Sequence, residues 1–414
     1  MYMEWLHIML LVLFVAVGCG VLWLTAPPRL YQLVPPADRR QIDSLVPDGA
    51  FRGNSVETFT SLDAMLPRML DDVARARHHV HMQFFKFEDD ATSHLVGDAL
   101  AAAAARGVEP RLLYDDFMCR RWRGYYRKLQ RRGVATAGFR PVRWPLLHRV
   151  DYYRNHRKCI VVDGRVAYIG GVNIADRYRY GLQWGHWRDT VVRIEGPAAL
   201  AVQRAFAFDW HYATGALLAT EVYFPAPVRV GALPVHIVMS GPIGDGPRLL
   251  ELTVAMVDAA RRYVWFESPY FIPPAALRRA LLAAARRGVD VRVLLPPRGD
   301  RGETTQWASK SYFATMLAAG VSIGLYQPGY MHSKIIVSDD RTAVVGSCNI
   351  DPRSYLLCQE IAAVVDDEGY AASLKAVFQA DEADSHFITP AEWAARPLSE
   401  RLCERAARLV ASQL

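Results

Sequence analysis

Two copies of one polar pattern, each on a hydrophobic β-hairpin, divide this chain into related halves. Residues 155–173 read NHRKCIVVDGRVAYIGGVN, and residues 331–349 read MHSKIIVSDDRTAVVGSCN. In both, a His and a Lys stand two residues apart, an Asp ends the first apolar run, and an Asn closes the segment. A strand points residues i and i+2 to the same face, so each His and Lys should lie side by side. A single pair of this kind is more often a surface feature, but two matched copies favour a shared function.

The repeat supplies a matched set of candidate site residues. The first copy contains His156, Lys158, Asp163 and Asn173, and the second contains His332, Lys334, Asp339 and Asn349. Two roles are open for the aspartates. They can take part in catalysis, or they can fix the hairpin turn, as the Asp163-Gly164 dipeptide suggests.

The likeness between the halves extends to whole helices and strands. ALAAAAARGVEPRLLYD (99–115) matches LLAAARRGVDVRVLLPP (281–297), and VHMQFF (80–85) matches VWFESP (264–269). Each longer segment reads as a helix, a Gly that can end it, and a strand. We therefore predict an α/β fold with two tandem halves at residues 45–216 and 237–414, related by a pseudo-twofold axis. The Pro-bearing residues 217–236 form the linker.

Both ends of the chain carry apolar helical patterns. Residues 1–27 predict a transmembrane helix, because the apolar run from Trp5 to Ala26 would rise about 33 Å as a helix, enough to cross the hydrocarbon layer of a bilayer. Residues 28–44 form a linker. Arginines follow the span and Glu4 precedes it, so the positive-inside rule predicts that the body lies in the cytoplasm. After Pro397 an amphipathic helix is expected, with packing on the body favoured over membrane contact. Its apolar stripe is Leu398, Leu402, Ala406, Leu409 and Val410.

The charge balance indicates an anionic partner. The 414 residues carry a net charge of +7, which suits nucleic acid, phospholipid headgroups or a membrane surface. The six cysteines show no C-x-x-C pair, and no G-x-x-x-x-G-K-[ST] loop is present. We therefore expect no metal, no nucleotide and no other cofactor.

Two imidazoles and two ammonium groups, pooled between the halves, are suited to phosphodiester exchange. One imidazole can attack phosphorus to form a phosphohistidine, and the other can move protons on the alcohols. The lysines and asparagines can hold the nonbridging oxygens. Each imidazole also needs an orienting acceptor, and the acids at parallel positions of the duplication, Asp189 and Glu360, are the candidates.

The doubled H-x-K-x-x-x-x-D with G-[GS]-x-N resembles the phospholipase D superfamily. RNHRK, YIGGVNIADRY, WRDTVVRIEGP, ESPYFIPP, YQPGYMHSK and GSCNIDPRS resemble, within it, the bacterial cardiolipin synthases, from about residue 45 to the end. The resemblance implies two α/β/α sandwich halves with the active site between them. It implies conversion of two phosphatidylglycerols to cardiolipin and glycerol through a phosphatidyl-histidine, without a cofactor. By analogy the nucleophile is His156 and the general acid is His332. The family usually has two N-terminal spans and a Glu at the position of Gln83, and this chain departs from both.

Four alternatives share parts of this pattern. A phospholipase D-type hydrolase would use water as acceptor, and a headgroup-exchange enzyme would use another alcohol. A superfamily nuclease is disfavoured by the predicted span and by an insert before His156 that is rich in Arg and aromatic residues, so nucleic acid is not an expected partner. A non-catalytic lipid-binding scaffold would be expected to carry a broken motif, and both copies here are complete. The oligomeric state is left open.

Overall fold

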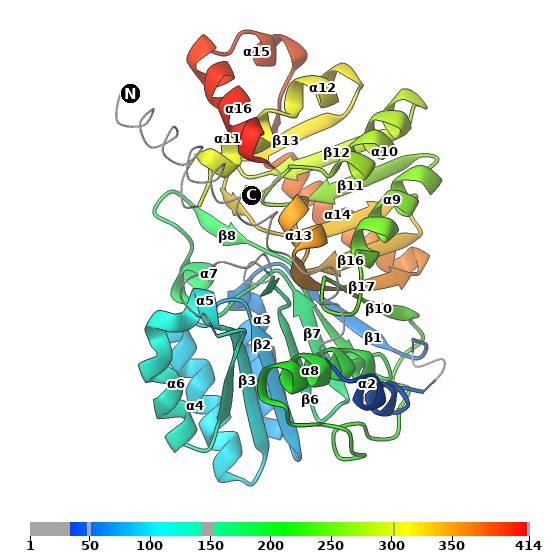
Figure 1. Cartoon of the computed structure of the whole chain (residues 1–414). Helices are drawn as coiled ribbons and strands as arrows, with labels where there is room; N and C mark the ends of the chain where they lie inside the picture. The colour runs from blue at the N-terminus through cyan, green and yellow to red at the C-terminus, as the bar shows by residue number, and fades with distance from the viewer. Residues whose placement is uncertain (1–33, 48–50, 142–152, 301–302, 412–414) are drawn as a thin grey trace.

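The computed structural model describes residues 34–47, 51–141, 153–300 and 303–411. Each half contains one mixed sheet with helices on both faces (Figure 1). The first sheet has the order β1-β9-β7-β6-β2-β3-β4. Its strands are β1 (Ser55–Phe59), β2 (His79–Phe84), β3 (Glu109–Asp115), β4 (Ala135–Phe139), β6 (Cys159–Val162), β7 (Val166–Gly170) and β9 (Val191–Glu195).

The second sheet repeats this order strand for strand. It runs β10-β17-β16-β15-β11-β12-β13 and adds β18 at the edge. Its strands are β10 (Val235–Ser240), β11 (Tyr263–Glu267), β12 (Asp290–Leu295), β13 (Ser322–Tyr326), β15 (Ile335–Ser338), β16 (Thr342–Gly346), β17 (Cys358–Asp366) and β18 (Ser385–Phe387). The duplication predicted from the sequence is therefore a duplication of topology.

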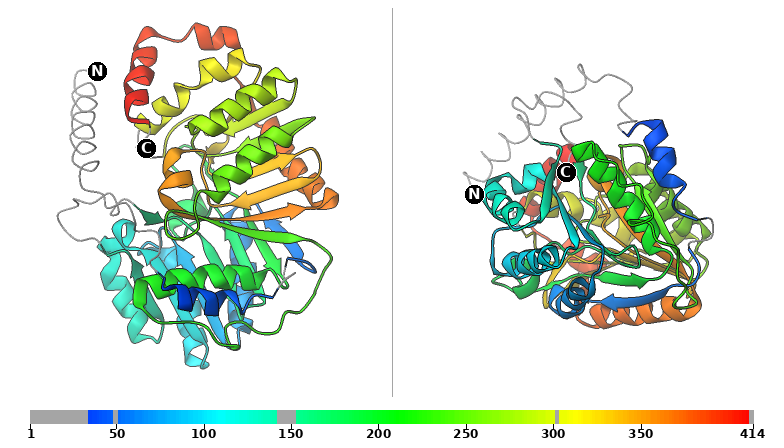
Figure 2. Two further views of the ribbon diagram at one scale, coloured as in Figure 1. Left: turned by 45° about the vertical axis from the view of Figure 1, so that its right-hand side comes forward. Right: turned by 90° about the horizontal axis from the view of Figure 1, so that it is seen from below.

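Helices cover both faces of each sheet (Figures 1 and 2). The first half has α2 (Pro36–Asp43), α3 (Leu62–Arg75), α4 (Ala91–Ala105), α5 (Asp116–Cys119), η1 (Arg120–Trp122), α6 (Arg123–Arg131), α7 (Asp176–Tyr180) and α8 (Ala199–Thr214). The second has α9 (Arg248–Ala259), α10 (Ala275–Arg286), α11 (Thr304–Lys310), α12 (Phe313–Ala318), α13 (Pro352–Leu356), α14 (Glu368–Ala383), α15 (Pro390–Ala394) and α16 (Leu398–Val410). After α4 and α10 the chain turns at Gly107 and Gly288, both with φ of 86°, a conformation that glycine adopts readily. The predicted α/β sandwich fold of the two halves is confirmed.

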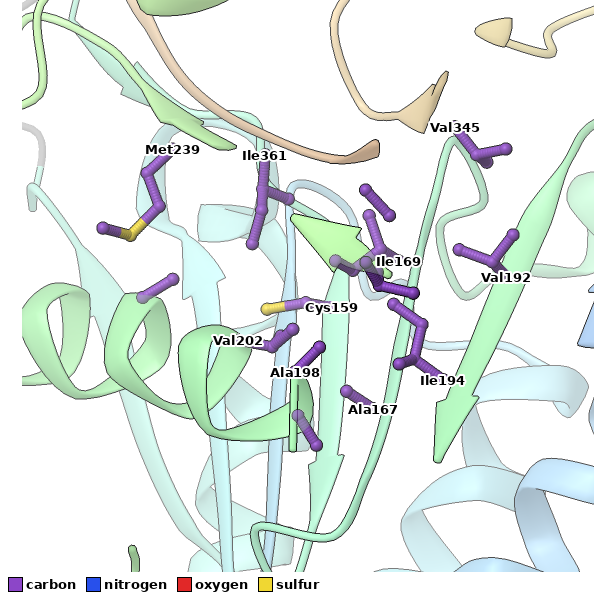
Figure 3. Packing of buried hydrophobic residues seen from close by; sticks show 14 of the residues in the cluster. Cys159, Ala167, Ile169, Val192, Ile194, Ala198, Val202, Met239, Val345 and Ile361 are labelled. Atoms are coloured by element: carbon purple, nitrogen blue, oxygen red, sulfur yellow. The ribbon is translucent and has the colours of Figure 1, made fainter. Parts of the chain in front are cut away.

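One hydrophobic cluster is shared by the two halves, and each half also has a cluster formed mainly by its own residues. Helices α8 and α14 belong to a single buried cluster that includes strands of both sheets. Figure 3 shows Ile169 of β7 and Val192 of β9 in the same buried cluster as Met239, Val345 and Ile361 of the second sheet. Burial of this apolar surface favours association of the halves, at about 25 cal/mol per Å².

Two short parallel strand pairs cross between the halves. β5 (Arg154–Asn155) pairs with the start of β17, and β14 (Gly329–Met331) pairs with β8 (His186–Arg188). Each pair joins the segment before one motif histidine to a segment of the other half. These crossings build the site described below.

The predictions for the two ends of the chain, a transmembrane helix and an amphipathic helix, compare differently with the structure. The predicted transmembrane helix lies outside the described residues, and no helix among residues 34–47, 51–141, 153–300 and 303–411 is long and apolar enough to cross a bilayer. The predicted C-terminal helix is α16. The prediction that its whole apolar stripe packs against the body is wrong. Val410 is buried, whereas Leu398, Leu402 and Leu409 are exposed.

Candidate active site

The crossing strands bring each motif histidine next to a carboxylate of the opposite half. Asn155 is in register with Gln359, so the next residues, His156 and Glu360, are neighbours. His156 N donates to Gln359 O at 2.9 Å. The second pair repeats this geometry, because Met331 is in register with Arg188 and His332 N donates to Arg188 O at 2.7 Å.

Each imidazole is oriented by a buried acid. His156 Nδ1 lies 2.8 Å from Glu360 Oε1, and His332 Nδ1 lies 2.6 Å from Asp189 Oδ2. Both carboxylates have side chains of 0% exposure, whereas the two histidine side chains retain 12% and 10%. Because Nδ1 is occupied by the acid, Nε2 is the nitrogen left for a substrate.

The two motif lysines accompany the histidines. Lys158 Nζ donates to His156 O at 2.6 Å, and Lys334 Nζ donates to His332 O. Both lysines are buried, with exposures of 2% and 4%. Each motif therefore places one ammonium group beside one imidazole, as the two-residue spacing predicts.

Comparison with known proteins gives the family. The family model described as "Cardiolipin synthase, PLD-like domain" matches residues 69–210 and 253–382. The chain belongs to this family. It is 35% identical over 362 residues to the major cardiolipin synthase of Bacillus subtilis, covering 86% of this chain and 75% of that protein. A cardiolipin synthase of Geobacillus kaustophilus is 36% identical over 377 residues, covering 90% of this chain and 73% of the relative.

Solved structures support the fold of this family member. The crystal structure of phosphatidylserine synthase from Haemophilus influenzae has a TM-score of 0.67 at 13% identity, covering 91% of this chain and 100% of that chain. At that identity the likeness concerns the fold alone. The predicted membership of the cardiolipin synthases is confirmed, and the predicted function and enzyme class agree with the names of the relatives.

The electrostatics show that the two motifs meet in one place. Burial, and then the charges of Lys158 and Lys334, hold the pKa of His156 well below its ordinary value. Burial and the charge of Lys334 lower the pKa of His332 to about 3, with Lys158 acting in the same direction. Each imidazole is therefore influenced by the lysine of the opposite half, which requires the four groups to be close.

The pKa values of the two orienting acids are shifted in opposite directions. Burial raises the pKa of Glu360 to about 7, although Lys158 acts against it. Burial would also raise the pKa of Asp189, but His332 and Lys334 lower it overall. Asp189 therefore stays ionised at lower pH than Glu360 does.

The motif aspartates lie away from the imidazoles. Asp163 accepts backbone N–H groups of Arg77, His78 and His79 at 2.8–2.9 Å. Asp339 accepts the equivalent three from residues 261–263. Both residues have positive φ, 51° and 52°, at the hairpin turns. This arrangement favours the turn-fixing role that the sequence left open over the catalytic role.

The motif asparagines are buried but differ in their contacts. Asn173 accepts from Lys86 N at 2.9 Å and donates to the Tyr178 hydroxyl at 3.2 Å. Its amide is therefore engaged in holding the loop after β7. Asn349 is 5% exposed, and its Oδ1 has no partner among the described residues.

Several site residues were not predicted from the sequence. Ser347 Oγ donates to Glu360, and Trp187 Nε1 donates to Asp189 Oδ2 at 3.4 Å. Phe85 packs edge-on against His156 with ring centroids 4.7 Å apart. The position of Ser347 within the repeated G-[GS]-x-N was a usable signal, but nothing in the sequence spacing points to the aromatic residues.

Proposed function

We propose that this protein is a cardiolipin synthase that transfers a phosphatidyl group from one phosphatidylglycerol to another. The observation that carries the proposal is the reciprocal arrangement of His156 with Glu360 and His332 with Asp189. Two oriented imidazoles with two buried lysines supply a nucleophile, a proton carrier and anion binding in one site.

In the first step His156 Nε2 attacks the phosphorus of phosphatidylglycerol. A P–N bond forms as the P–O bond to glycerol breaks, and His332 gives its Nε2 proton to the departing alkoxide. The product is a phosphatidyl-histidine and free glycerol. Lys158 and Lys334 offset the charge on the nonbridging oxygens.

In the second step the acceptor is the glycerol hydroxyl of another phosphatidylglycerol. His332 takes the hydroxyl proton, the oxygen attacks phosphorus, and the P–N bond breaks. Cardiolipin leaves and both histidines return to their starting forms. One phosphodiester is exchanged for another, so the reaction needs no nucleotide.

The roles of the histidines follow from their acids. A general acid must carry a proton. The carboxylate of Asp189, whose pKa is lowered, stabilises an imidazolium at His332. An anionic phosphodiester between the lysines also raises the pKa of His332 above its value in the free protein. At His156, an Nδ1–H that donates to the Glu360 carboxylate leaves the lone pair of the neutral ring on Nε2, where it can attack phosphorus.

The substrates imply a membrane partner. We assign the protein to a bacterial inner membrane with its two halves on the cytoplasmic side, anchored through residues 1–27. The support is the apolar run of residues 5–26 and the arginines that follow it.

The test uses the full chain in mixed micelles with phosphatidylglycerol as the sole lipid. We expect free glycerol and cardiolipin in equal amounts without added metal or nucleotide. His156→Ala and His332→Ala should each lower turnover by more than about 10²-fold. Only the chain that retains His156 should trap a phosphatidyl adduct. Phosphatidic acid as the only product would favour the hydrolase, and full activity of either variant would contradict the two-histidine mechanism.

A further inference from the structure

Helix α16 presents an apolar face to solvent. Leu398, Leu402 and Leu409 are 68%, 41% and 77% exposed. At 100° per residue these leucines fall within one narrow sector of the helix. The helix packs on the body through the opposite side, where Ala407 and Val410 are buried.

The body holds α16 firmly in this orientation. Arg396 makes a bidentate pair with Glu404, with both N–O distances 2.8 Å. Arg408 donates to Ser311 O at 2.7 Å, and its guanidinium stacks over the Tyr312 ring at 4.4 Å. The exposed leucines are therefore a fixed feature of the surface and not a frayed end.

Basic side chains border the leucines. Arg401 and Arg405 are exposed and lie next to the leucine sector on the helical wheel. An apolar stripe bordered by arginines is typical of a helix that lies in the plane of a membrane interface, with the arginines among anionic headgroups. The net charge of +7 on the chain acts in the same direction.

We propose that α16 docks on an anionic lipid bilayer, inserting Leu398, Leu402 and Leu409 at the level of the headgroups. Helix α16 packs beside α11, which is the first helix after β12 (Figures 1 and 2). Docking would thus fix the second half on the lipid surface through an element near the loops at the ends of its parallel strands. The inference concerns a surface outside the active site and does not depend on the proposed function.

The test measures lipid contact at one position of α16 without turnover. An environment-sensitive fluorophore is attached at Leu409→Cys in a Cys403→Ala background, in the full chain reconstituted into vesicles. The vesicles contain phosphatidylglycerol and phosphatidylcholine, with nitroxide-labelled lipid as quencher. The matched control is Val228→Cys, because Val228 is also exposed, at 50%, but lies in the segment that covers the first half. The Cys403→Ala chain alone gives the blank for other cysteines.

We expect the label at 409 to be quenched about twofold or more and the label at 228 to be unaffected. Quenching at 409 should fall on vesicles of phosphatidylcholine alone, and also with Arg401→Gln/Arg405→Gln. A label at 409 that behaves like the label at 228 overturns the proposal, as does equal quenching on neutral vesicles. A label that is shielded from water but not quenched by lipid also overturns it, and identifies a protein occupant. Dependence on protein concentration then separates a second copy from residues 1–33 of the same chain.

Discussion

Position 171 is restricted to glycine by the acid that holds His332. A Cβ atom on Gly171 would lie 2.1 Å from Asp189 Oδ1. The corresponding position of the second half is Ser347, whose hydroxyl donates to Glu360. A glutamate is one methylene longer than an aspartate, so one half combines a short acid with glycine and the other a long acid with serine. The histidine of the opposite half is oriented in both cases.

Replacing the glycine of the first half by serine should displace the aspartate that lies against it. We expect Gly171→Ser to lower the turnover of phosphatidylglycerol by about 10²-fold, because the new side chain displaces Asp189 from His332. Gly171→Ser/Asp189→Glu should recover part of the loss by reproducing the second half. Ser347→Gly, which introduces no clash, is the control and should cost less. Wild-type turnover in the Gly171→Ser variant would contradict this account.

The buried lysines predict a pH dependence of substrate binding. Burial lowers the pKa of Lys158 to about 7 and that of Lys334 to about 8. Both ammonium groups are charged below these values and lose their protons as the pH rises. The KM for phosphatidylglycerol should therefore rise between about pH 6.5 and about pH 9, more steeply than kcat falls, since a bound phosphodiester raises both pKa values. A flat KM, with the melting temperature constant over the same range, would exclude this role of the lysines.

At the scale of elements, the hairpin turn of each motif is joined to the start of the neighbouring strand. The carboxylates of Asp163 and Asp339 each accept three consecutive backbone N–H groups, at the starts of β2 and β11. The hairpins therefore keep their register against β2 and β11, with which β6 and β15 pair antiparallel. The four residues between Lys and Asp in the motif are thus the first hairpin strand, β6 in one half and β15 in the other.

This placement separates stability from chemistry. Asp163→Ala should lower the free energy of unfolding by about 1–3 kcal/mol, because it leaves three N–H groups without their charged acceptor. Asp163→Asn, which keeps one acceptor oxygen and tolerates positive φ, should cost less. Turnover per folded molecule should stay near the wild-type value in both, measured alongside chemical denaturation. A loss of kcat with an unchanged free energy of unfolding would instead indicate that Asp163 takes part in catalysis.

At the scale of the molecule, a buried arginine between the motif residues ties the halves together. Arg157, 1% exposed, donates to Asp209 at 2.9 Å, to Asp245 at 2.5 Å and to Glu360 O at 3.1 Å. Gln83 donates to the same Asp209 at 2.7 Å. With the shared core, this network makes the two halves one structural unit.

Removing that arginine should destabilise the whole chain. Arg157→Leu removes the buried cation shared by two carboxylates. Among the described residues, Asp209 then keeps only the amides of Gln83 and Asn155, and Asp245 keeps only its pair with Arg39. The loss should cost about 3–5 kcal/mol in the free energy of unfolding. Arg341→Leu, at an exposed pair with Asp366, is the control and should cost about 0–1 kcal/mol. Calorimetry of the wild type should show one cooperative transition. Two separate transitions, with Arg157→Leu shifting only one, would contradict a shared structural unit.

The local features of this protein could be predicted from its sequence. The two-residue spacing predicted that each histidine lies beside its lysine, although the structure places these residues between strands and not within one. The glycines predicted the helix ends, and the repeated pattern predicted two equivalent sheets. These properties depend on neighbours in the chain, so a linear pattern can specify them. The parallel positions of Asp189 and Glu360 also identified them as orienting acids.

The way in which the two halves combine could be seen only in the tertiary structure. The sequence did not say that each histidine takes its acid from the other half, because that pairing depends on two short strands that cross the interface. It also assigned the leucines of α16 to the core, since an apolar stripe specifies a face of a helix but not what lies against it. Contacts between residues far apart in the chain are set by packing of the whole molecule, and no local period records them.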